Sequence, residues 1–179
     1  MKFYILFALT LIFAAVNSNF CPVKYLNTNG FTRIGTYNGY NDCTPYAKTY
    51  YLSTAYKYKW YEAKMFCEIN GMEFLTLETL DESDKFMQMF NLNPTVISDW
   101  VYIGGVTILP KSLDHWYWLD LGKPLSFQPK FAPGEPSGSH ISGNTEYCLS
   151  VGKVSGQSYY NDIRCDGLAY NFLCQTRDA

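Results

Sequence analysis

The chain has 179 residues and a formal net charge of −2, and 47% of its residues are hydrophobic. Lysine and arginine do not cluster into a basic face, which argues against nucleic acid as a partner. This length predicts one domain with a short N-terminal extension, enough chain to bury a hydrophobic core.

The first residues have the pattern of a secretory signal peptide. Lys2 precedes an apolar run over 3–16, and small residues around Ser18 suit cleavage there, so 1–18 is predicted to be the signal peptide. The alternative is a membrane anchor, but the run is about 14 residues, short of the roughly 20 that span a bilayer. No later segment is apolar enough to span. We therefore expect a secreted, extracellular protein.

Six cysteines follow the signal region, and an even number in a secreted chain predicts three disulfides whose pairing the sequence alone leaves open. Zinc binding is the alternative. It is disfavoured because the chain has no C-x-x-C pair and its two histidines, His115 and His140, are not at ligand spacing. The cysteines are Cys21, Cys43, Cys67, Cys148, Cys165 and Cys174.

The first half of the mature chain predicts an extension, two helices and short strands. The extension covers 19–49 and is rich in turns, with strands over 31–34 and 49–52 and a Cys21–Cys43 disulfide as its staple. Apolar spacing over 58–70 predicts a helix that ends at Asn70 and Gly71. The residues expected largely on one face of this helix are Trp60, Ala63, Met65, Phe66, Cys67 and Ile69.

A short strand is predicted over 74–77, followed by a second helix. Thr79 is expected to be the N-cap of this helix, with Glu82 completing a capping box. The helix is expected to end before Pro94 because proline cannot continue it.

The second half predicts mainly strands. A strand over 100–105 is expected to lead into a turn at its glycines, and a strand over 115–120 places Trp116 and Trp118 on one face. A long loop over 122–145 is rich in proline, glycine and serine, and loops of this length are usually functional or disordered. Three strands over 147–151, 159–163 and 170–175 close the chain. Helices first and strands later indicate an α+β fold.

The last third of the chain carries several oxygen donors close to cysteines. Ca²⁺ prefers such hard donors, whereas Zn²⁺ prefers nitrogen and sulfur. Three carboxylates gathered without a cation would repel one another, so an ion is the natural reason for any convergence. The candidate donors are Glu135, Ser137, Glu146, Asn161 and Asp162.

The order of these landmarks resembles the C-type lectin-like domain family over residues 50–176. The segment 60–67, with its tryptophan, alanine and cysteine, resembles the first helix of the family. Residues 102–105 resemble its tryptophan-isoleucine-glycine core motif, with Tyr102 in place of tryptophan, and 116–120 resemble the next strand. The resemblance implies a C-type lectin-like domain over 50–179. Its two helices would pack on small antiparallel sheets, with a long loop region and disulfide staples.

The family's cysteine pattern implies two disulfides, Cys67–Cys174 and Cys148–Cys165. Cys21 and Cys43 are then left over. They either staple the N-terminal extension or link chains in an oligomer.

In sugar-binding members of the family one Ca²⁺ binds the sugar's vicinal hydroxyls. The matching ligands here are Glu135, Ser137, Glu146, Asn161 and Asp162, with a cis bond before Pro136. A glutamate-first triplet favours mannose-like sugars, whereas galactose-type sites usually have Gln-Pro-Asp, so either class of sugar stays open. Ser137 replaces the family's asparagine, which is expected to weaken Ca²⁺ binding. A second Ca²⁺ site is not expected, because 107–111 lacks the required acids.

The resemblance implies a secreted calcium-dependent lectin whose partners are glycans. The alternative is a calcium-independent lectin-like domain that binds a protein partner. Glu135 and Glu146 could also be read as the carboxylate pair of a glycosidase, but that reading needs an open cleft and no bound ion. The chain also lacks a Ser/His/Asp order and a phosphate loop, so we expect no enzyme.

Overall fold

The computed structural model describes residues 25–41, 44–96, 100–139 and 143–178. The signal peptide, His140 and both Cys21 and Cys43 lie outside these residues, so cleavage near Ser18 and the Cys21–Cys43 pairing stay predictions. The described residues form two helices and two sheets, and every pairing between the named strands is antiparallel. The predicted α+β class is confirmed.

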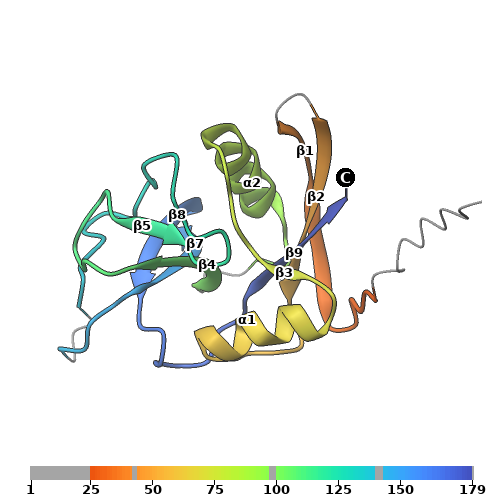
Figure 1. Ribbon diagram of the computed structural model, residues 1–179. Coiled ribbons are helices and arrows are strands. Elements are labelled where there is room, and N and C mark those ends of the chain that lie inside the picture. Colours follow the sequence, from red (N-terminus) through yellow and green to blue (C-terminus); the bar gives the residue numbers. More distant parts are fainter. Residues whose placement is uncertain (1–24, 42–43, 97–99, 140–142, 179) are drawn as a thin grey trace, which may run out of the picture.

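A four-stranded sheet joins the two ends of the described chain. Its strands are ordered β1 (Phe31–Asn41), β2 (Thr44–Ser53), β9 (Leu173–Asp178) and β3 (Glu73–Phe74). Figure 1 shows β1 and β2 as a long hairpin beside the C-terminal strand. The predicted strands over 31–34 and 49–52 are too short, because pairing continues along almost the whole hairpin. The domain boundary at residue 50 stays a prediction, although β2 spans it.

The first helix, α1 (Trp60–Ile69), ends at Asn70 as predicted, and Gly71 follows with φ +78°. A Cβ at Gly71 would lie 1.6 Å from the carbonyl oxygen of Tyr25, so only glycine fits there. Trp60, Ala63 and Cys67 are buried, but Met65 and Ile69 are exposed. Their predicted inward placement is wrong, because at 3.6 residues per turn both positions face away from the side that carries Trp60 and Cys67.

The second helix, α2 (Leu80–Leu92), begins at the predicted N-cap. The Thr79 hydroxyl accepts a hydrogen bond from the Glu82 backbone N–H at 3.1 Å. The predicted capping box is wrong, because the Glu82 carboxylate instead accepts from the Glu78 N–H at 2.8 Å and from the Tyr50 hydroxyl at 2.8 Å. In Figure 1 this helix lies between the two sheets, in contact with β1 on one side and β8 on the other.

The second sheet has five strands in the order β6, β5, β4, β7, β8. It carries Trp116 and Trp118 on one buried face, as predicted. The strand bounds are β4 (Val101–Thr107), β5 (Trp116–Trp118), β6 (Lys123–Pro124), β7 (Cys148–Val154) and β8 (Gln157–Ile163).

The turn predicted at Gly104 and Gly105 is wrong, because β4 continues through both. A Cβ at Gly104 would lie 2.8 Å from the carbonyl oxygen of Leu75, and one at Gly105 would lie 2.6 Å from the Leu149 side chain. The glycines therefore serve close packing against neighbouring segments rather than a change of direction. The strand predicted over 74–77 is also shorter, since β3 covers only Glu73–Phe74.

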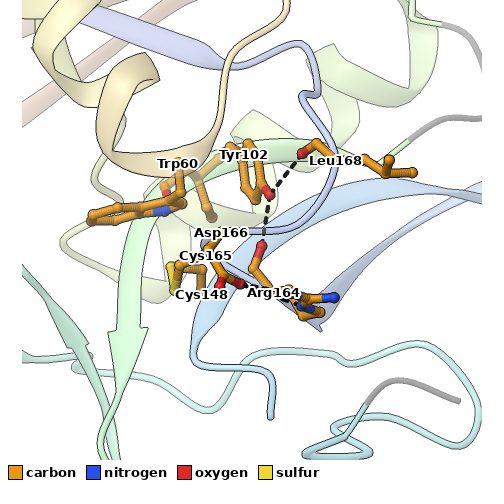
Figure 2. The surroundings of a disulfide bond; sticks show 8 residues. Trp60, Tyr102, Cys148, Arg164, Cys165, Asp166 and Leu168 are labelled. Carbon is orange, nitrogen blue, oxygen red and sulfur yellow. Dashed lines mark hydrogen bonds and ion pairs between the residues drawn. A yellow bond between two sulfur atoms is a disulfide. The ribbon is translucent and has the colours of Figure 1, made fainter. Parts of the chain in front are cut away.

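Both disulfides implied by the resemblance are present. Cys67–Cys174 ties α1 to β9, and Cys148–Cys165 ties β7 to the segment after β8. Tyr102, in place of the family's tryptophan, donates its hydroxyl to the carbonyls of Arg164 at 2.7 Å and Leu168 at 3.3 Å (Figure 2). Neither helix in the described part of the chain combines the length and apolar character needed to cross a membrane.

Candidate functional site

Three segments bring the predicted oxygen donors together. Glu135 and Ser137 lie on the long loop between β6 and β7, on either side of Pro136, and the Glu135–Pro136 bond is cis as expected. Glu146 lies two residues before β7, while Asn161 and Asp162 lie near the end of β8. The loop is tied to β8, because the Ala132 N–H donates to the Tyr160 carbonyl at 2.9 Å. Tyr160 itself is buried in the core.

Ser137 joins the three predicted carboxylates. Its backbone N–H donates to Glu135 Oε2 at 2.7 Å and to Asp162 Oδ1 at 3.1 Å. Its hydroxyl Oγ lies 3.0 Å from Glu146 Oε2 and donates to it. The structure therefore brings four of the five predicted residues into one connected cluster.

Asn161 is the fifth predicted residue, and it is buried beside Asp162 in β8. Its side-chain oxygen Oδ1 has no hydrogen-bond partner in the described part of the chain. A buried carbonyl oxygen left unpaired costs roughly 1–3 kcal/mol. It is also the kind of neutral oxygen that Ca²⁺ accepts as a ligand.

Burial of the cluster disfavours negative charge. Burial, the hydrogen bond with Glu135 and the nearby Glu146 carboxylate together raise the pKa of Asp162 to about 6, although the Gly138 and Ser137 N–H groups oppose the rise. Burial also raises the pKa of Glu146, against the effect of its hydrogen bond from Ser137. A cation placed here would offset this cost.

The donor types of the cluster fit Ca²⁺, since they are carboxylate, amide and hydroxyl oxygens. Within the described residues, however, no three or more His, Cys, Asp or Glu side chains gather closely enough to hold a metal ion. Both carboxylate oxygens of Asp162 instead accept backbone N–H groups, from Ser137 at 3.1 Å and from Gly138 at 2.6 Å. The N–H groups of the loop backbone thus stabilise the Asp162 carboxylate, as a bound cation would.

Gly138 is a site residue that the sequence did not single out. It has φ +69°, and a Cβ there would lie 2.7 Å from the backbone nitrogen of Lys111. This close approach lets the Gly138 N–H reach Asp162. A glycine directly after the Glu-Pro-Ser triplet was the available signal, because a turn with positive φ favours glycine.

The comparisons with known proteins agree with this fold. No family model matches the chain. The chain is 27% identical to a "C-type lectin mannose-binding isoform" of Oxyuranus scutellatus over 167 residues, covering 90% of this chain and 86% of that protein. A protein of the same description from Notechis scutatus scutatus is 26% identical over 167 residues, with the same shares of the two chains.

The mouse scavenger receptor C-type lectin carbohydrate-recognition domain is a similar solved structure. It has a TM-score of 0.56 and 25% identity, covering 79% of this chain and 95% of that one. The fold, the disulfides and these similarities together show a C-type lectin-like fold.

Proposed function

We propose that this protein is a secreted, calcium-dependent lectin that binds a mannose-like or galactose-like sugar through vicinal hydroxyls on one Ca²⁺. The observation that carries the proposal is the cluster in which Ser137 links Glu135, Glu146 and Asp162. Two snake relatives described as mannose-binding and a mouse neighbour described as a carbohydrate-recognition domain support it.

Each residue has a defined part in this proposal. Glu135, Glu146 and Asp162 supply negative charge, and the unpaired Oδ1 of Asn161 supplies a neutral oxygen. When bound, Ca²⁺ supplies a charge that attracts the oxygens of two neighbouring sugar hydroxyls. Each hydroxyl also needs a hydrogen-bond acceptor and donor. Glu146 with Asn161, and Glu135 with Ser137, provide these groups.

Secretion is supported by the disulfides. Cys67–Cys174 and Cys148–Cys165 are bonds that persist mainly in oxidising, extracellular environments. A cleaved signal peptide over 1–18 is part of the same proposal.

A calcium-independent domain that binds a protein partner is the second candidate. It is favoured by the hydrogen bonds of Ser137 and Gly138 to Asp162, which satisfy both of its carboxylate oxygens from within the chain. Titration calorimetry with Ca²⁺ and sugar, with and without EDTA, separates the two functions. Absence of heat at millimolar Ca²⁺, or sugar binding that chelation leaves unchanged, favours the second candidate.

Replacing a proposed ligand is expected to abolish sugar binding while the domain stays folded. In Glu135→Ala one carboxylate is lost, and in Asn161→Ala the unpaired amide oxygen is lost, so Ca²⁺ and sugar binding fall together. Calorimetry with methyl mannoside and methyl galactoside checks binding, and circular dichroism checks folding. Asn38→Ala, at an exposed position on β1, is the matched control and should bind normally. Full sugar binding by Asn161→Ala would contradict its role.

Restoring the family's asparagine is expected to strengthen calcium binding. In Ser137→Asn the amide oxygen can face the ion while its N–H faces the sugar, whereas the serine hydroxyl has one oxygen for both tasks. We expect the Ca²⁺ affinity of Ser137→Asn to rise by about tenfold, or about 1.4 kcal/mol, as measured by calorimetry. Ser139→Asn, two residues along the same loop, is the control. A lower affinity in Ser137→Asn would show that Ser137 lies outside the coordination sphere.

A further inference from the structure

A cavity of about 610 Å³ lies beside the candidate calcium site but shares none of its ligands. Thr145 and Tyr147 line it, whereas Glu146 between them hydrogen-bonds to Ser137. Side chains alternate along an extended segment, so the cavity lies on the opposite side of this segment from the Glu146 carboxylate. The cavity is therefore a separate feature of the domain.

The floor of the cavity is held firmly. Cys165 lines it and is fixed by the disulfide to Cys148 and by the backbone N–H of Trp60, which donates to the Cys165 carbonyl at 3.2 Å. The Tyr102 hydroxyl also fixes the Arg164 carbonyl. Figure 2 shows these groups around the disulfide, with Arg164 and Asp166 on the segment that follows β8. A site held by so many bonds needs little rearrangement to accept a ligand.

Large apolar side chains that are exposed to solvent line the walls of the cavity. Ile108 is 73% exposed and Tyr61 is 60% exposed, while Leu119 and Tyr147 are 43% and 42% exposed. These side chains come from α1 and from the segments that follow β4, follow β5 and precede β7. Exposed apolar side chains gathered around one hollow mark an interaction site. The volume lies within the range of small-molecule pockets, about 300–1,000 Å³.

The charges on the rim cancel. Arg164 Nη2 lies 3.1 Å from Asp166 Oδ1, and Arg164 Nε donates to the same oxygen at 3.3 Å. This cation and this carboxylate neutralise each other, so the pair gives the rim no net charge. The walls meanwhile favour apolar surface.

We propose that this cavity binds an uncharged, predominantly apolar group about the size of one or two rings. The group is either a free compound or the apolar part of a glycoconjugate. The inference does not depend on calcium binding.

The test uses N-phenylnaphthylamine, an uncharged probe that becomes fluorescent in apolar surroundings, with the full secreted chain. The native protein should bind it saturably and equally with Ca²⁺ or with EDTA. Ile108→Asp places a charge in the wall and should weaken binding by about tenfold or more. Leu92→Asp changes another strongly exposed apolar residue, at the end of α2 and not in the cavity lining, and should change affinity by less than about twofold. Leu119→Asp is a second wall variant in case Ile108→Asp does not fold.

Absence of saturable binding to the native protein would overturn the inference, as would equal affinity in Ile108→Asp, Leu119→Asp and Leu92→Asp. Sedimentation tests a second copy of the chain as the occupant. A dimer that Ile108→Asp dissociates would also overturn it. Competition by octanol and by an octyl mannoside then shows whether the bound apolar group is a free compound or part of a glycoconjugate. A free apolar ligand predicts the same competition with and without EDTA, and a glycoconjugate predicts stronger competition by the mannoside when Ca²⁺ is present.

Discussion

Replacing Cys67 and Cys174 together by alanine is expected to lower the free energy of unfolding by about 4–5 kcal/mol. The disulfide links residues 107 positions apart, so it removes a large amount of conformational entropy from the unfolded chain. Cys174 also pairs with Tyr51 of β2 and Phe74 of β3, so the bond holds α1 against the middle of the four-stranded sheet. Urea unfolding under oxidising conditions, followed by circular dichroism, measures the loss.

The second disulfide provides the matched control. Cys148 and Cys165 are only 17 positions apart, so the double alanine variant of this pair is expected to lose about 3 kcal/mol. Both variants remove two sulfurs and one crosslink, and the length of the closed loop is the main difference between them. An equal loss in the two variants, or a larger loss for Cys148 and Cys165, would contradict loop closure as the source of stability.

The sequence predicted the parts of the fold that depend on local patterns. Apolar spacing located the first helix, the N-cap at Thr79 and the proline at 94 located the second, and the alternation around Trp116 and Trp118 located β5. The errors arose where distant segments decide the structure. Gly104 looked like a turn, but the approach of Leu75 explains the glycine, and Leu75 lies far away in sequence. Glu82 looked like half of a capping box, but its carboxylate faces the buried hydroxyl of Tyr50 on β2.

The candidate site also has a part that the sequence predicted and a part that it did not. The identities of its donors and the cis bond before Pro136 could be read from a motif, because the motif is a run of side chains along the chain. The backbone N–H groups of Ser137 and Gly138, which contact Asp162, could not be read this way. Every residue except proline carries an N–H, so only the path of the loop decides which of them reaches a carboxylate.

Lys48 is the other position where we expect a substitution to lower the free energy of unfolding strongly. This lysine on β2 is fully buried, and its Nζ lies 2.8 Å from Glu82 Oε1, 2.9 Å from Glu78 Oε1 and 3.1 Å from the Thr76 carbonyl oxygen. Burial lowers the pKa of Lys48 and raises that of Glu82, so each charge is tolerated only because the other is present. Lys48→Met should therefore cost about 3–5 kcal/mol of unfolding free energy, because it leaves the Glu82 carboxylate buried without a cation. Urea unfolding at neutral pH measures this loss.

Neutralising the unpaired Glu82 carboxylate should recover part of the lost unfolding free energy. The Tyr50 hydroxyl and the Glu78 N–H donate to different oxygens of the Glu82 carboxylate, so the single amide oxygen in Lys48→Met/Glu82→Gln keeps only one of these bonds. No buried charge remains unpaired, and this gain should outweigh the lost hydrogen bond. The double variant is therefore expected to be more stable than Lys48→Met alone. Lys85→Met removes a lysine whose ion pair with Asp81 is exposed, and it should cause no measurable loss. If the double variant were less stable than Lys48→Met, the penalty would come from lost packing around the lysine stem rather than from an unpaired charge.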